Sequence, residues 1–146
     1  MDSFNKMSVS NSPVAGAVEL VEFGDALCHR SQHVRKAISA ILDQFNGQPL
    51  TYAYRHYPDP ANTQSILAAV AAEAASRQGK LWPMYTALCT QPLINCATLG
   101  ALALTLELDQ SRFFHDLLDD HVYSRVTMDW RAGHLFRGSL PIDALY

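Results

Sequence analysis

Four consecutive residues of this sequence, Cys28, His29, Arg30 and Ser31, are the best suited to chemistry, because they open a stretch with helical periodicity. The first turn of a helix leaves backbone N–H groups without partners and carries the positive end of the helix dipole. Both effects favour a thiolate, as do the neighbouring positive charges, so we expect the pKa of Cys28 to lie below the ~8.5 of a free cysteine. The alternative is a buried structural cysteine, since cysteine often packs as a small hydrophobe.

The other two cysteines have different settings. Cys89 shares a helical stripe with Leu81, Tyr85 and Leu88, which predicts a core position, whereas Cys96 falls in the first turn of a later helix and is predicted to be partly exposed. A disulfide between Cys89 and Cys96 across the short intervening loop stays open as an alternative.

Two predicted strands and a helix position Cys28. Residues 17–23 form a short β-branched and aromatic run that indicates a buried strand. A helix follows to residue 45, and its apolar face is Val34, Ala37, Ile38, Ile41, Leu42 and Phe45. Residues 49–58 alternate as a second strand, so the unit is βαβ and the strands should be parallel.

His56 lies at the end of the second predicted strand, in the run Tyr54–Tyr57. Ligand sites in open α/β sheets form beyond the carboxyl ends of the strands, so His56 is a candidate neighbour of Cys28. An ordinary polar strand end explains the same residues equally well.

The remaining sequence is helical in pattern for about 75 residues. An alanine-rich segment ends at Gly79, and Pro83 falls in the first turn of the next helix, where proline is tolerated. Asn95 and Asp109 are predicted N-caps of two further helices, and a weaker helix runs to about Gly138.

Composition excludes several classes of function. The net charge is −3 with no basic block, which argues against a nucleic-acid partner. No apolar run approaches the roughly 20 residues that span a bilayer, and the N-terminus lacks the apolar core of a secretory signal, so a cytoplasmic location is predicted, or a periplasmic one if a leader was removed. The cysteines and histidines lack metal-ligand spacing, so neither a metal nor a bound cofactor is expected.

Several segments resemble the DsbA-like thioredoxin-fold oxidoreductases. They are "VELVEFGDALC" (18–28), "YRHYP" (54–58), "AAVAAEAASRQGKLWPMYTAL" (68–88) and "LELDQSRFFHDL" (106–117). The resemblance implies an α/β thioredoxin-like fold with a helical insertion at about 62–137, within a single domain of residues 14–146 that follows a disordered tail, 1–13. It also implies Pro141 as the cis proline facing the cysteine, while the family's last strand and helix are lacking.

The resemblance further implies a C-x-x-C motif, and Ser31 replaces its second cysteine. A protein with one thiol can still form a mixed disulfide with a substrate, but an external thiol such as glutathione must resolve it. We therefore expect monothiol exchange or disulfide isomerisation, with Cys28 as nucleophile, His29 and Arg30 lowering its pKa, Ser31 hydrogen-bonding to the sulfur and Pro141 shaping a peptide groove.

Two alternatives remain at this stage. One is a non-catalytic thioredoxin-fold binding or regulatory module, and the other is a glutathione-using transferase or isomerase of the kappa type. The expected partners are protein or peptide thiols and disulfides, with glutathione as a co-substrate. Self-association into a homo-oligomer is also expected, because the shortened sheet would leave an open strand edge.

Overall fold

The computed structural model describes residues 16, 18–45 and 50–139 of the chain, so the predicted tail 1–13 and Pro141 lie outside the described residues. The elements in chain order are β1 (Val18–Gly24), α1 (His29–Gln44), β2 (Leu50–His56), α2 (Thr63–Ser76), α3 (Leu81–Leu88), α4 (Cys96–Thr105), α5 (Gln110–Leu117) and α6 (Asp120–Ser139). The predicted order of strand, helix, strand and then a long helical region is confirmed.

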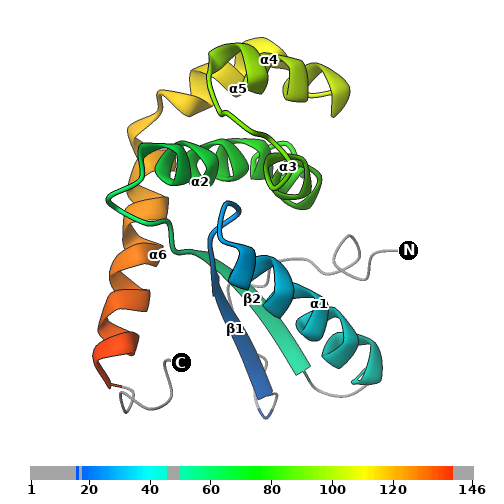
Figure 1. Ribbon diagram of the computed structural model, residues 1–146, viewed down its shortest axis with the longest axis vertical. Coiled ribbons are helices and arrows are strands. Elements are labelled where there is room, and N and C mark those ends of the chain that lie inside the picture. The colour runs from blue at the N-terminus through cyan, green and yellow to red at the C-terminus, as the bar shows by residue number, and fades with distance from the viewer. Residues whose placement is uncertain (1–15, 17, 46–49, 140–146) are drawn as a thin grey trace.

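The two strands form a parallel pair in which Val18 lies opposite Leu50 and Gly24 lies opposite His56. Helices α1 and α6 lie on opposite faces of this pair, as Figure 1 shows. Both faces of β2 are therefore covered, and Tyr52, Ala53 and Tyr54 are buried in succession instead of alternating with exposed residues.

Helix α6 packs closely on the sheet through aromatic rings. Phe23 stacks on Phe136, and Tyr57 stacks on Trp130, with ring centroids 6.3 Å apart in each pair. Gly133 permits this approach, because a Cβ atom at that position would lie 2.6 Å from a ring carbon of Tyr57 and 2.8 Å from one of Phe23.

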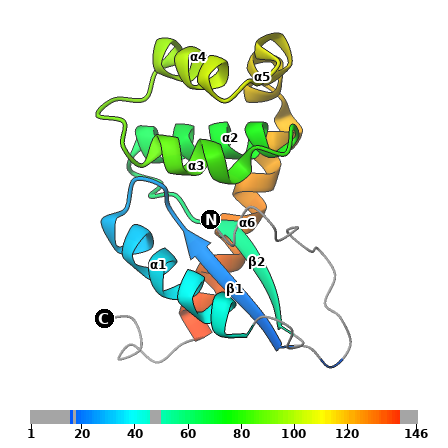
Figure 2. The same ribbon diagram turned by 90° about the vertical axis from the view of Figure 1, so that its right-hand side faces the viewer.

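Helices α2 and α3 lie across the carboxyl end of both strands, and α4 and α5 lie beyond them (Figures 1 and 2). Alanines dominate the buried surface of α2, which lets the neighbouring helices approach closely. The predicted caps are confirmed: the side chain of Asn95 accepts from Thr98 N–H, and that of Asp109 accepts from Arg112 N–H, each at 2.9 Å.

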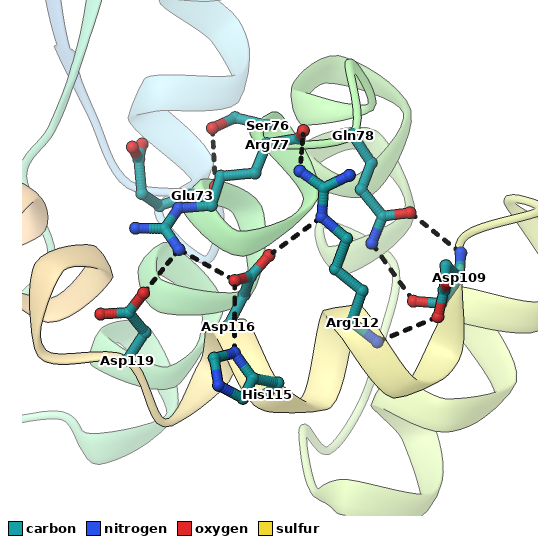
Figure 3. A network of polar contacts seen from close by, with 9 residues as sticks. All are labelled: Glu73, Ser76, Arg77, Gln78, Asp109, Arg112, His115, Asp116 and Asp119. Atoms are coloured by element: carbon teal, nitrogen blue, oxygen red, sulfur yellow. Dashed lines mark hydrogen bonds and ion pairs between the residues drawn. The ribbon is translucent and has the colours of Figure 1, made fainter.

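A polar network joins the end of α2 to α5, as Figure 3 shows. Arg77 contacts the carboxylates of Asp116 at 2.8 Å and Asp119 at 2.6 Å. The Gln78 side chain donates to the Asp109 carbonyl at 3.2 Å and accepts from its N–H at 2.9 Å. These contacts attach the outer helices to α2 and hence to the end of the sheet.

The apolar face predicted for α1 is only partly buried. Ile38 and Leu42 are buried, but Val34, Ile41 and Phe45 are 51%, 39% and 49% exposed. The sheet formed by the described residues has two strands, and this narrow sheet buries only the middle of the apolar face of α1. The stripe that sequence periodicity identifies is thus wider than the surface available to bury it.

We expect Gly133→Ala to destabilise the fold by about 1–3 kcal/mol, because the new methyl group would overlap two packed rings. Gly100→Ala in α4 is the matched control: a Cβ there would meet Phe114 at an ordinary 3.6 Å. That substitution should stabilise the protein by about 0.5–1 kcal/mol through helix propensity alone. Urea unfolding of both variants measures the two effects, and equal responses would contradict the close packing of α6.

Candidate active site

Cys28 is the N-cap residue of α1, with extended backbone angles (φ −89°, ψ 118°) and a half-buried side chain. Its carbonyl accepts from Gln32 N–H at 3.1 Å, whereas its thiol makes no capping hydrogen bond and the first turn of α1 contains no acidic residue. The thiol therefore lies at the N-terminal end of α1 and is not used to cap the helix.

The three residues after Cys28 take different positions. His29 and Arg30 begin α1 with exposed side chains, so solvent screens their charges. Ser31 is half-buried, and its hydroxyl oxygen accepts a hydrogen bond from Asp25 N–H at 3.2 Å. The hydrogen bond from the Ser31 hydroxyl to the sulfur of Cys28 stays a prediction from the sequence.

Asp25 organises the loop that leads to Cys28, a role that the sequence analysis missed. Its carboxylate accepts from Leu27 N–H at 2.9 Å and from the Ser65 hydroxyl at 2.7 Å. Its carbonyl accepts from Cys28 N–H at 3.1 Å and from the Tyr85 hydroxyl at 3.5 Å. An aspartate side chain that accepts from the backbone N–H two residues later forms an Asx turn. Asp25 directly after the strand-ending Gly24 was the feature of the sequence that could have predicted this turn.

Gly24, which precedes Asp25, allows β1 to end against a buried ring. The Tyr54 hydroxyl donates to the Gly24 carbonyl at 2.9 Å, and a Cβ at Gly24 would lie 2.7 Å from the Tyr54 ring. The glycine that the sequence indicated as the end of the strand is therefore required by close packing.

A buried acid lies behind this loop. Glu22 of β1 accepts a hydrogen bond from the Tyr52 hydroxyl and lies 3.8 Å from the Arg35 guanidinium. Burial raises the pKa of Glu22 above its usual 4.5, and the contacts with Tyr52 and Arg35 only partly offset that effect. Arg35 in turn lies over the Trp82 ring at 3.6 Å from its centroid, which fixes the guanidinium between α1 and α3.

His56 lies at the same end of the sheet as Cys28, since it pairs in register with Gly24. The buried ring of His56 is hydrogen-bonded to the Glu73 carboxylate of α2 at 3.0 Å. The backbone N–H of His56 donates to the Asp129 carboxylate of α6 at 3.1 Å. Burial alone would raise the pKa of Glu73, but the hydrogen bond and charge of His56, with Arg125 and Arg77, lower it. These contacts favour a structural role for His56 in joining β2 to α2 and α6.

The three cysteines are free, so the disulfide between Cys89 and Cys96 that the sequence left open is not formed. Cys96 is exposed at the start of α4, as predicted. Cys89 is half-buried: it packs against the core, as predicted, and also lines a groove between α1 and α3. Burial raises the pKa of the Cys89 thiol, and Arg35 opposes that rise.

Within the described part of the chain, no cluster of three or more histidine, cysteine, aspartate or glutamate side chains is arranged to hold a metal ion. No helix of that part is long and apolar enough to cross a membrane.

No family model matches the chain. Among curated proteins, it is 33% identical over 119 residues to the Na(+)/H(+) antiporter NhaA 1 of Salinispora arenicola, which is 80% of this chain and 18% of that protein. It is 40% identical over 100 residues to NhaA 1 of Mycolicibacterium gilvum, which is 67% of this chain and 16% of that protein. The chain thus spans less than a fifth of the length of these relatives.

Solved structures match over most of the chain. The oxidoreductase DsbA from Xylella fastidiosa gives a TM-score of 0.70 at 18% identity, covering 90% of this chain and 72% of that one. A thioredoxin-like oxidoreductase from Silicibacter pomeroyi gives 0.63 at 26% identity, covering 82% and 68%. The thiol-disulfide exchange protein alpha-DsbA2 from Wolbachia pipientis gives 0.67 at 16% identity, covering 83% and 66%.

We expect Glu22→Gln to change the pH dependence of stability. A carboxyl whose pKa is raised on folding contributes stability below its unfolded pKa and loses that contribution as pH rises through the folded pKa. The glutamine variant should therefore gain stability relative to the parent as pH rises above 4.5. Urea unfolding between pH 4 and pH 8 tests this, with the exposed Glu19→Gln on the same strand as control. Parallel profiles for the two variants would contradict it.

We expect Cys28 to be alkylated by iodoacetamide faster than Cys89 at neutral pH, because burial disfavours the Cys89 thiolate. Cys96 is the internal control, since it also begins a helix but is followed by Ala97 and Thr98 in place of two potential cations. The ratio of the Cys28 rate to the Cys96 rate should fall as salt is added. Mass spectrometry of each cysteine peptide gives the rates, and equal rates for all three would contradict the assignment.

Proposed function

The chain has the DsbA-like thioredoxin fold, and we propose that it carries out thiol–disulfide exchange through Cys28. The observation that carries the proposal is the position of Cys28 at the start of α1, with its thiol unused by the helix cap. The contacts of Asp25 support it further, because they fix the loop on which the thiol is presented.

The proposed reaction uses one thiol of the protein. The Cys28 thiolate attacks one sulfur of a substrate disulfide, so a new S–S bond forms to Cys28 while the substrate bond breaks. The second substrate sulfur leaves as a thiolate and takes a proton from water. A thiol from the same substrate or from a small molecule such as glutathione then attacks the mixed disulfide and releases Cys28.

The outcome of a cycle depends on the resolving thiol. When it belongs to the substrate, the disulfides are rearranged with no net oxidation, which is isomerisation. When it belongs to an external monothiol, that molecule forms a mixed disulfide with the substrate as Cys28 leaves. A second external thiol then cleaves this bond, so the two external thiols are oxidised to their disulfide and the substrate is reduced. Use of glutathione, self-association of the chain, a cytoplasmic location and the part played by Pro141 remain predictions from the sequence.

The direct test is to trap the intermediate. The chain is incubated with a peptide disulfide, quenched with acid and analysed by mass spectrometry for a peptide attached to Cys28. Cys28→Ala should lose this adduct, whereas Cys96→Ala should retain it. Absence of any adduct on Cys28 would overturn the proposal and favour the non-catalytic binding module.

We expect Ser31→Cys to increase disulfide reduction by about tenfold, because a second thiol three residues after Cys28 can resolve the mixed disulfide within the same molecule. The measurement is insulin reduction with dithiothreitol as the recycling thiol. Ser31→Ala is the matched control, since it removes the same hydrogen bond to Asp25 N–H without adding a thiol. Equal rates for the cysteine and alanine variants would contradict resolution by a second thiol.

A further inference from the structure

A groove of about 740 Å³ runs between α1 and α3, and the proposed exchange reaction does not use it. Its α1 side is formed by Gln32, Arg35, Lys36 and Ser39, which follow one another at helical spacing on one face. Gln32 is hydrogen-bonded through its N–H to the carbonyl of Cys28. The groove therefore begins one helical turn from the candidate nucleophile.

The groove is cationic although the chain as a whole carries a net charge of −3. Arg35 and Lys36 line it, and its lining contains no carboxylate among the described residues. The Arg35 side chain is only 13% exposed and its guanidinium lies over the Trp82 ring, whereas Lys36 is exposed. A partly buried guanidinium with an exposed ammonium nearby suits a carboxylate ligand.

The acids nearest to the groove already have partners within the protein. The Glu22 carboxylate of β1 lies 3.8 Å from the Arg35 guanidinium and also accepts a hydrogen bond from the Tyr52 hydroxyl. The carboxylate of Asp25 accepts from Leu27 N–H and the Ser65 hydroxyl. Glu22 offsets much of the charge of Arg35, so Lys36 supplies most of the positive charge that a ligand would meet.

We propose that this groove binds an acidic side chain of the protein substrate, a few residues from the cysteine that reacts with Cys28. Lys36 is eight residues after Cys28, which places it about 12 Å along the helix. An extended peptide advances about 3.3 Å per residue, so the acidic residue would lie about three or four positions from the reacting cysteine. Trp82 lines the groove beside Arg35, so the intervening peptide would pass close to its ring.

The inference rests on the proposed function, but the test measures groove binding separately from exchange at Cys28, because the probe has no thiol. The probe is an acetylated and amidated peptide with serine in place of the reacting cysteine and glutamates three and four positions after it. A second peptide places the glutamates before the serine, and control peptides carry glutamine. Trp130→Phe leaves Trp82 as the single tryptophan, so its fluorescence reports binding in the groove.

Of the two glutamate peptides, the one whose direction matches the groove should bind about tenfold more tightly than its glutamine control. Lys36→Glu should remove this preference. Arg131→Glu is the matched control, because it makes the same charge change at an exposed site on α6 and should leave the preference intact. Equal binding of glutamate and glutamine peptides, failure of both to bind, or equal effects of the two charge reversals would overturn the groove assignment. Loss of the Cys28 adduct with groove binding intact would instead overturn the exchange activity alone.

Discussion

The geometry of the candidate site depends on the hydrogen bonds that converge on Asp25. Its carboxylate accepts from Leu27 N–H and from the Ser65 hydroxyl of α2, while its carbonyl accepts from Cys28 N–H. One residue thus connects the turn after β1, the start of α1 and the helical region. The side chains of Ser31, Ser65 and Tyr85 are also partners of Asp25, so the position of the thiol depends on the identity of those residues.

A second, buried layer supports that loop from beneath. Glu22, Tyr52 and Arg35 form a contact chain from the sheet to α1, and Arg35 continues it onto the Trp82 ring of α3. A buried charge is stable only when it is paired, so Arg35 has to remain between the acid and the ring. This requirement keeps α1 and α3 at a fixed separation, and the groove between them follows from it.

The strands, the parallel pairing and the capped helices were predictable, because periodicity and caps such as Asn95 act within a few residues of sequence. The position of Cys28 at the start of α1 was predictable for the same reason. The role of Asp25 was not, since its partner Ser65 is 40 residues away. The exposure of Val34 and Phe45 also escaped prediction, because helical periodicity does not say how much of an apolar stripe its neighbours cover.

The contacts of Asp25 and the chain from Glu22 to Trp82 also suggest how a protein with one reactive thiol could work. Ser31 has no sulfur, and burial raises the pKa of the Cys89 thiol. Under the proposed chemistry each mixed disulfide then lasts until an outside thiol arrives. During that wait, only non-covalent contacts can orient the attached substrate for attack on the correct sulfur. A cationic groove that begins one turn from Cys28 and is held open by buried charge is placed to supply those contacts.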